Sequence, residues 1–366
     1  MVNVLIEASR FDVATAAIKG GRDYQEDSLI AHFPLGQETG FAVLADGMGG
    51  HLSGDVASAL VMTETFSRLK MKEMILDKGI TDIPALLGKA AGAANDCVTQ
   101  YIEDEPESYG MGSTLLATVI RGEDLFWVSV GDSPLFLFRD GEIRQLNQDH
   151  SMAPQIDMMV KVGAMDEEVG RNHPDRNTLT SAIAGLNINK IDCPAEPTKV
   201  QPGDIIVVAS DGIQFLSNDE IQDILNATRD KSSHEISQAL LAAIAKLDDP
   251  EQDNTAFTVI KLGDLSLQAA QATADKGAAL VQLKKDLRPI TRIIDVPADS
   301  AAEKPAEVKT PLTDVPTKRV IRLVTSQALS FDAPEEPHVE AGTPEPADIK
   351  TQNQGAWYSR RHKLND

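Results

Sequence analysis

Short apolar runs in the first 262 residues follow one another in pairs, which leaves few possible architectures. The runs are rich in β-branched and aromatic residues and are bounded by Gly, Asp or Pro, a pattern typical of strands. They lie at 41–45, 113–120, 125–130, 135–138, 205–209 and 256–260. Directly after the fourth run, Asp140-Gly141 predicts a two-residue hairpin turn. Strands that are joined in this way predict antiparallel sheets.

Segments with helical periodicity also occur in pairs. They are expected at 53–74, 83–102, 217–227 and 233–247. Pro84 stands at a first-turn position, and Ser217 followed by Glu220 has the spacing of a capping box. Because strands and helices do not alternate one for one, the sequence favours an α+β fold. In that fold, helix pairs cover antiparallel sheets, in contrast to a doubly wound parallel sheet.

Charge and composition argue against several classes of protein. The chain carries 34 Lys and Arg against 56 Asp and Glu, a formal net charge of −22. Such a balance argues against binding to nucleic acid or to an anionic membrane surface. No apolar run approaches the length of a membrane span, and the first residues lack the pattern of a signal peptide. Cys97 and Cys193 show no metal-ligand spacing and fit a reducing compartment, so the sequence predicts a cytoplasmic protein.

Composition changes after Leu262. Of the 19 prolines in the chain, 9 lie in the 103 residues from 264 onward, where turn signals and apolar runs no longer alternate. The sequence predicts one globular domain over 1–262 and a second segment over 263–366. That segment is expected to contain an amphipathic helix at 266–287, followed by a largely disordered tail rich in Pro, Glu and Ala. No partner can be assigned to the tail.

Four acid-bearing blocks stand at predicted strand ends or in glycine-rich turns. They are 21–27 (Gly-Arg-Asp-Tyr-Gln-Glu-Asp), 46–51 (Asp-Gly-Met-Gly-Gly-His), 210–212 (Ser-Asp-Gly) and 253–254 (Asp-Asn). Converging carboxylates need a compensating cation, and oxygen ligands without Cys or imidazole favour Mg²⁺ or Mn²⁺ over Zn²⁺. Taken singly, each block is better explained as an ordinary turn, as Asp140-Gly141 is. Taken together, the blocks are interpreted from their order along the chain.

In that order, the blocks resemble the motifs of the metal-dependent Ser/Thr protein phosphatases of type 2C, the PPM family, in their bacterial form. Four further blocks extend the resemblance over roughly 12–262. They are 112–115 (Gly-Ser-Thr-Leu), 130–133 (Val-Gly-Asp-Ser), 148–151 (Gln-Asp-His-Ser) and 179–180 (Leu-Thr). The resemblance implies a four-layer α/β/β/α sandwich, in which helix pairs flank two central antiparallel sheets. It also implies that 1–262 is the catalytic domain, with a flap at 152–178.

The resemblance further implies a centre with two Mn²⁺ or Mg²⁺ ions and a third, weaker one. Matched motif by motif, Asp46 is catalytic and bridges two of the metals. Asp211 and Asp253 complete the coordination of one metal, and the carbonyl of Gly47 serves the other. Asp132 would hold the third ion together with Asp211.

Three residues of the first block complete the implied site. Glu26 and Asp27 line it as metal ligands, directly or through water, and Arg22 binds the substrate phosphate. The implied reaction is hydrolysis of phosphoserine and phosphothreonine monoesters by a hydroxide that bridges two divalent metals. The implied partners are phosphorylated proteins, in signalling opposite a cognate bacterial Ser/Thr kinase. Control of type VI secretion is one such setting.

Two departures from the family pattern leave alternatives open. Met48 stands where many eukaryotic relatives carry a His that is proposed as the general acid. His51 and His150 are the nearby candidates, and structural hydrogen bonding is the stronger interpretation of both. Pro134 replaces a usual Arg and so removes a cation near the site. These departures motivate the alternative of a catalytically weak scaffold that binds phosphoproteins.

The flap contains several methionines at helical spacing. The pattern of Met158, Met159, Val160, Val162 and Met165 predicts one amphipathic helix. Core packing is the usual explanation of such a pattern, and adaptable contact with a substrate is the second.

Overall fold

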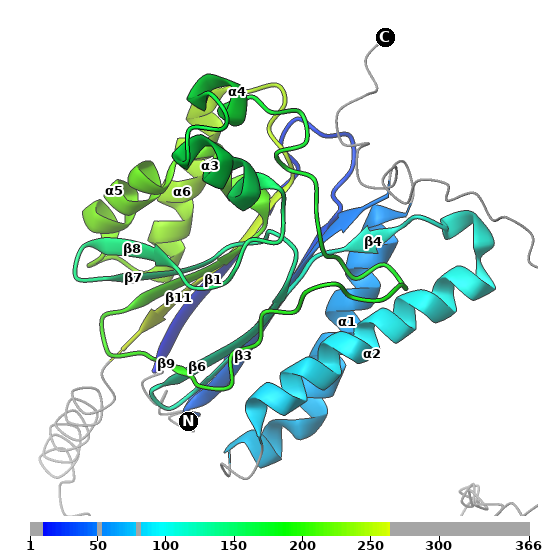
Figure 1. Cartoon of the computed structure of the whole chain (residues 1–366). Coiled ribbons are helices and arrows are strands. Elements are labelled where there is room, and N and C mark those ends of the chain that lie inside the picture. Colours follow the sequence, from blue (N-terminus) through cyan, green and yellow to red (C-terminus); the bar gives the residue numbers. More distant parts are fainter. Residues whose placement is uncertain (1–9, 50–52, 78–81, 264–366) are drawn as a thin grey trace, which may run out of the picture. The chain divides into compact units, whose positions relative to one another are not determined.

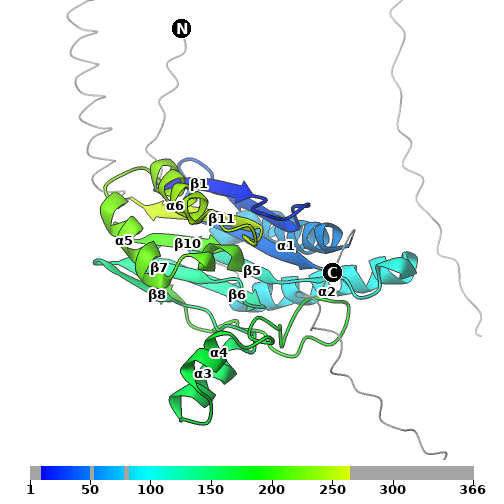
Figure 2. The same cartoon turned by 90° about the horizontal axis from the view of Figure 1, so that it is seen from above.

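Two antiparallel sheets pack face to face, with a pair of helices on each outer face (Figures 1 and 2). The computed structural model describes residues 10–49, 53–77 and 82–263. The helix predicted over 266–287 and the tail that follows it lie outside the described residues. None of the described helices combines the length and the apolar character that a membrane span requires.

The strands divide between the sheets in a non-sequential order. The first sheet has the order β1 (Phe11–Ile18), β11 (Thr255–Leu262), β10 (Ile205–Ala209), β7 (Leu135–Arg139) and β8 (Glu142–Gln145). The second has the order β2 (Asp27–His32), β3 (Thr39–Met48), β5 (Leu115–Arg121), β6 (Asp124–Val130) and β9 (Thr198–Lys199), with β4 (Gly112–Ser113) paired to β3. The first and last strands, β1 and β11, are therefore neighbours.

Two helix pairs form the outer layers. The second sheet packs against α1 (Gly54–Asp77) and α2 (Ile83–Asp104). The first sheet packs against α5 (Asn218–Thr228) and α6 (Ser233–Leu247). A third apolar cluster fills the space between the sheets. Together these clusters give the predicted α/β/β/α order, and the predicted fold class is confirmed.

Strand alternation decides which side chains enter the space between the sheets. On β3, Phe41 and Val43 pack with the helix layer of α1 and α2. Ala42 and Leu44 pack with the inter-sheet cluster. Because successive side chains of a strand point to opposite faces, Asp46 shares the face of Ala42 and Leu44. The polar end of β3 is therefore directed into the space between the two sheets.

Local signals located several elements correctly. Asp140 and Gly141 both have positive φ, 54° and 92°, and join β7 to β8 as the predicted hairpin. Ser217 and Glu220 form the predicted capping box at the start of α5. The sequence did not predict β1 and β2. Both strands are only partly buried, so their sequences lack the continuous apolar run on which the strand prediction relied. β1 and β2 are also edge strands of their sheets.

The segment over 152–178, which was predicted to be a flap, contains two short helices in place of the predicted single one. They are α3 (Ala153–Lys161) and α4 (Glu167–Arg171). The α3 helix buries Ile156, whereas Met158 and Met159 are 58% and 43% exposed. Core packing is therefore the wrong explanation for these two methionines. Their exposure leaves contact with another molecule as the explanation to be tested.

Candidate active site

Four strand ends from both sheets meet at one end of the sandwich. The start of β2 lies beside the end of β3, because Asp27 pairs with Asp46 in the register. The end of β10 lies beside the start of β11, where Ala209 pairs with Phe257. A hydrogen bond of 2.7 Å from the Ser210 hydroxyl to Asp27 Oδ2 joins these two pairs across the sheets. The acidic blocks at 21–27 and 210–212 and the described part of the second block, 46–49, therefore come together at this end.

Asp27 and Asp46 face one another directly across the β2–β3 pair. The amide of Asp46 donates to Thr114 Oγ1 and its carbonyl accepts from the Thr114 amide, so both groups point away from β2. Asp27 and Asp46 therefore form a non-hydrogen-bonded pair, in which Cα atoms are about 4.5 Å apart and side chains are close. Both carboxylates are buried, with Asp27 9% and Asp46 6% exposed. Two like charges in this position repel one another, and a cation between or beside them would offset that repulsion.

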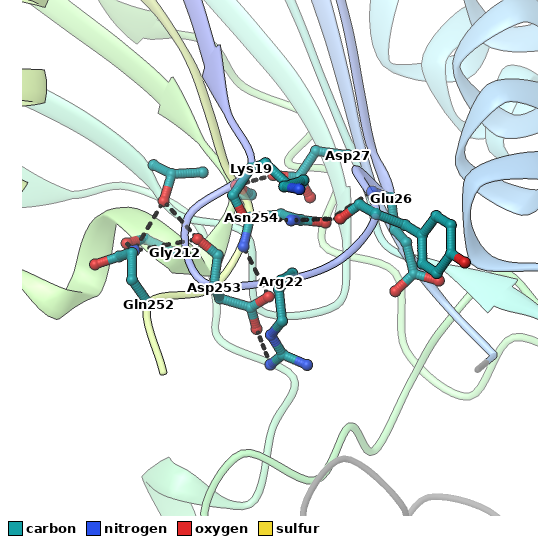
Figure 3. Close-up of polar contacts among 11 residues, drawn as sticks. Lys19, Arg22, Glu26, Asp27, Gly212, Gln252, Asp253 and Asn254 are labelled. Carbon is teal, nitrogen blue, oxygen red and sulfur yellow. Dashed lines mark hydrogen bonds and ion pairs between the residues drawn. The ribbon is translucent and has the colours of Figure 1, made fainter. Parts of the chain in front are cut away.

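The loop over 19–26 is attached to the start of β11 by Asn254. Its side-chain oxygen accepts from the Glu26 amide at 2.7 Å. Its side-chain nitrogen donates to the carbonyls of Lys19 and Tyr24 at 2.8 and 2.9 Å (Figure 3). The sequence placed Asn254 in an acidic block but assigned it no role. These three bonds attach the first block to the last.

Arg22 and Asp253 form an ion pair at the end of the sandwich where the acidic blocks meet. Nη2 of Arg22 lies 2.8 Å from Oδ2 of Asp253, and Figure 3 shows the two side chains side by side. The Arg22 side chain is 43% exposed, and only Nη2 is used in this pair, so further N–H donors are available to solvent or to a ligand. The predicted phosphate-binding residue and one predicted metal ligand are thus in direct contact.

Two glycines allow the acidic blocks to approach closely. The Gly47 amide donates to the Glu26 carbonyl at 3.0 Å, and a Cβ at Gly47 would collide with the carbonyl oxygen of Gly54. A Cβ at Gly212 would collide with the carbonyl oxygen of Asn254. Glycine at these positions therefore lets the end of β3 approach the start of α1, and lets the segment after β10 approach the start of β11.

Asp132 lies in a buried loop between β6 and β7. It is 6% exposed and stands between Gly131, whose φ is 109°, and Ser133. The Ser133 hydroxyl lies 2.8 Å from Thr114 Oγ1, the atom that accepts from the Asp46 amide. The loop therefore reaches the Asp27–Asp46 pair through one intervening side chain. Pro134, which has no amide hydrogen, still accepts at its carbonyl from the Ala209 amide at 3.1 Å.

The donors in this region fit a divalent cation in their chemistry. Across 10–49, 53–77 and 82–263, no three His, Cys, Asp or Glu side chains are grouped so as to hold a metal ion as they stand. The fit rests on the facing carboxylates of Asp27 and Asp46 and on the oxygen-only set around them. Carboxylate and carbonyl oxygens are the ligands that Mg²⁺ and Mn²⁺ prefer. A cation there would offset the repulsion between the facing carboxylates.

His150 has a structural position beside the Asp132 loop. Its ring is 2% exposed, and Nδ1 accepts a hydrogen bond from the Gly131 amide at 3.2 Å. Its carbonyl accepts from the amide and the hydroxyl of Thr180, both at 2.7 Å. Because Nδ1 is an acceptor, the ring is neutral and carries its proton on Nε2. These contacts agree with the structural interpretation of His150, and His51 lies outside the described residues.

Stability is expected to depend on pH through His150. Burial is the main cause that lowers the pKa of this imidazole below its usual 6.5. Below about pH 6.5 the imidazole of His150 binds a proton in the unfolded chain but not in the folded chain. The free energy of unfolding therefore falls as pH decreases. The slope for one such proton is at most about 1.4 kcal/mol per pH unit.

The measurement is urea unfolding between pH 8 and pH 5.5. His150→Asn removes the titrating ring but keeps an acceptor, so its stability should fall less steeply below pH 6.5 than that of the wild type. His234→Asn, on α6, is the control and should retain the wild-type slope. Equal slopes in the wild type and His150→Asn would contradict the assignment.

Comparisons with known proteins agree on one family. A family model described as Protein phosphatase 2C matches residues 22–248. The serine/threonine protein phosphatase PstP of Mycobacterium tuberculosis is 33% identical over 203 residues, which are 54% of this chain and 35% of PstP. This chain thus spans about a third of the length of that relative. The serine/threonine phosphatase Stp of Listeria welshimeri is 31% identical over 191 residues, which are 52% of this chain and 73% of Stp.

Solved structures share the fold. The catalytic domain of PstP in complex with 2 manganese ions superposes with a TM-score of 0.52 at 28% identity, covering 69% of this chain and 99% of that one. PppA, described as a key regulatory component of the type VI secretion system in Pseudomonas aeruginosa, gives a TM-score of 0.51 at 23% identity, covering 69% and 98%. The likeness to PppA is one of fold alone.

Proposed function

Because the chain belongs to the protein phosphatase 2C family, we propose that it hydrolyses phosphoserine and phosphothreonine monoesters in proteins. The observation that carries the proposal is the facing pair of buried carboxylates, Asp27 and Asp46, at the end of the sandwich where Arg22 also lies. A cation bound beside these two carboxylates would offset the repulsion between them. An exposed guanidinium nearby provides a partner for a phosphate.

The metal ligands are proposed from the positions of the acidic blocks. Asp46 would be a ligand shared by two ions, Asp211 and Asp253 would hold one of them, and the Gly47 carbonyl would serve the other. Glu26 and Asp27 complete the site, directly or through water. Asp132 and Asp211 are proposed to hold a third, weaker ion. When bound, divalent ions of this kind lower the pKa of a water molecule and neutralise charge on the phosphoryl group.

Arg22 is proposed to bind and orient the phosphate group of the substrate. Its planar guanidinium presents several N–H donors that match two phosphate oxygens at once, which a Lys ammonium does not reproduce. A phosphate that takes Nη2 displaces Asp253, with which that nitrogen is paired at 2.8 Å. A partly exposed ion pair contributes about 0–1 kcal/mol, so this exchange costs little.

The proposal places the activity in residues 1–262, with the segment over 152–178 as a flap beside the site. The substrates are phosphorylated proteins in signalling opposite a bacterial Ser/Thr kinase, and control of type VI secretion is one setting for such a pair. Comparison of phosphoproteins between strains with and without this chain would identify the substrates directly. A substrate protein should gain phosphoserine or phosphothreonine in its absence.

The direct test is release of phosphate from a phosphothreonine peptide by the full chain, with and without Mn²⁺ or Mg²⁺. We expect turnover that requires the metal and is lost on addition of a chelator. Binding of Mn²⁺ in a calorimeter without any turnover would favour the alternative, a scaffold that binds phosphoproteins. Turnover that is unaffected by chelation would contradict the proposed chemistry.

A further inference from the structure

Two buried hydroxyl groups connect the end of β3 to the loop that carries Asp132. Thr114 is 0% exposed and Ser133 is 1% exposed. Thr114 Oγ1 accepts from the Asp46 amide at 3.0 Å and lies 2.8 Å from the Ser133 hydroxyl. Since Thr114 Oγ1 already accepts from Asp46, its own proton is available for Ser133. A chain of two hydrogen bonds therefore runs from Asp46 to the residue next to Asp132.

Thr114 also holds the main chain on both sides of this connection. Its amide donates to the Asp46 carbonyl at 2.8 Å, which fixes the end of β3. Its methyl group lies under Gly131, where an added Cβ would come within 2.6 Å of Thr114 Cγ2. Thr114 thus contacts the residue before Asp132 with its methyl group and the residue after Asp132 with its hydroxyl.

Asn147 and His150 also contact the Asp132 loop. Asn147 donates to the Ser133 carbonyl at 2.9 Å and accepts from the Leu135 amide at 2.8 Å. His150 accepts from the Gly131 amide at 3.2 Å. These contacts hold the shape of the loop, but none of them reaches Asp46. The link through Thr114 is therefore a direct side-chain connection between the loop and β3, in addition to the pairing of β6 with β5 and of β5 with β3.

We propose that Thr114 is a positioning residue that holds the carboxylates of Asp46 and Asp132 at one spacing through its hydroxyl group. The consequence for metal binding and catalysis rests on the proposed function. Buried hydroxyl groups are costly unless they are hydrogen-bonded, and supporting groups of this kind orient the residues that bind a metal. Loss of the hydroxyl should loosen the Asp132 loop relative to β3 while leaving the apolar packing in place.

The chain offers a matched control in Thr118. It lies four residues further along, within β5, and is also 0% exposed. Within the described residues its hydroxyl has no hydrogen-bond partner. Thr114→Val and Thr118→Val thus make the same chemical change at two buried sites of one segment, and only the first breaks a link. Thr114→Ser keeps the hydroxyl and removes the methyl group.

The experiment compares these variants in the full chain by two measurements. One is calorimetric titration with Mn²⁺ alone, and the other is kcat and KM for a phosphothreonine peptide at saturating Mn²⁺. Thr114→Val should weaken the weakest Mn²⁺ site and lower kcat, each by roughly 10-fold or more, with KM changed little. Thr118→Val should match the wild type, and Thr114→Ser should recover most of the loss. If Thr114→Val fails to fold, Ser133→Ala removes the other end of the link and should weaken the same Mn²⁺ site.

Three results would overturn the inference. The first is equal Mn²⁺ affinity and kcat in Thr114→Val and Thr118→Val. The second is a loss in Thr114→Ser as large as that in Thr114→Val, which would assign the effect to the methyl group. The third, where Thr114→Val does not fold, is unchanged Mn²⁺ binding in Ser133→Ala. If the wild type binds Mn²⁺ but turns over no phosphopeptide, the proposed function fails, and the calorimetric comparison still decides the role of Thr114.

Discussion

Replacing Asp46 by Asn is expected to reduce hydrolysis of a phosphothreonine peptide by roughly 10³-fold or more, and to raise the melting temperature of the metal-free protein. The loss follows because Asp46 is the proposed bridging ligand, and metal ions supply several kcal/mol of transition-state stabilisation. The gain follows because the variant removes one of two carboxylates that face one another between the sheets. Like charges directly opposite on neighbouring strands cost up to about 1 kcal/mol.

The two effects can be separated by measuring thermal unfolding with and without Mn²⁺. A ligand that binds only the folded state raises the free energy of unfolding by about 2.7 kcal/mol at 100 times its Kd. The wild type should gain stability when Mn²⁺ is added, whereas Asp46→Asn should gain much less. Asp12→Asn is a suitable control, because Asp12 lies near the other end of β1 and contacts Ser233. Full activity in Asp46→Asn would refute the metal assignment.

Replacing Arg22 by Ala should lower kcat/KM by about 100-fold, because a positioned cationic donor to the phosphoryl group is lost. Arg22→Lys should recover only part of this, since an ammonium cannot contact two phosphate oxygens in the planar arrangement of a guanidinium. The stability of the fold should change by less than about 1 kcal/mol, because the ion pair with Asp253 is partly exposed. Arg22→Ala should therefore lower activity strongly and leave the stability of the fold nearly unchanged.

A titration with Mn²⁺ separates substrate binding by Arg22 from an effect on the metal. Removal of the guanidinium takes a positive charge away from Asp253, so Mn²⁺ should bind to Arg22→Ala at least as tightly as to the wild type. Arg139→Ala is not an equivalent control, because Arg139 pairs with the buried Asp204. Arg68→Ala is the better control, because its ion pair with Glu64 is exposed and lies on α1. Weakened Mn²⁺ binding in Arg22→Ala would assign Arg22 to the metal site instead of the substrate.

Long periodic segments and turn signals predicted most of the fold. The bounds of α6 match the predicted range, and the capping box at Ser217 marks the start of α5. These signals are local, so they can be found without knowledge of the rest of the chain. β1 and β2 were missed because their partners supply what their own sequences lack. β1 is stabilised by pairing with β11 along its whole length, and that contact is invisible in the residues 11–18 alone.

The acidic members of the site were found from their order, but the residues that hold them in place were not. Ser210, Asn254 and Thr114 all lie within motif blocks, yet the sequence assigned them no role. Each acts on a distant segment: Ser210 on Asp27, Asn254 on Glu26, and Thr114 on Asp46. A small polar residue beside a strand end has the same local pattern whether or not such a partner exists. Only the folded arrangement distinguishes the two cases.

The neighbouring position of β1 and β11 has a consequence for the order of events during protein synthesis. Arg22 leaves the ribosome long before Asp253, and 231 residues separate these two members of the ion pair. The space on the first sheet between β1 and β10 stays open until β11 is made. The proposed site therefore cannot be complete at any earlier stage of synthesis, and contacts over such distances form slowly. Translation that stops before β11 yields a fragment without the site.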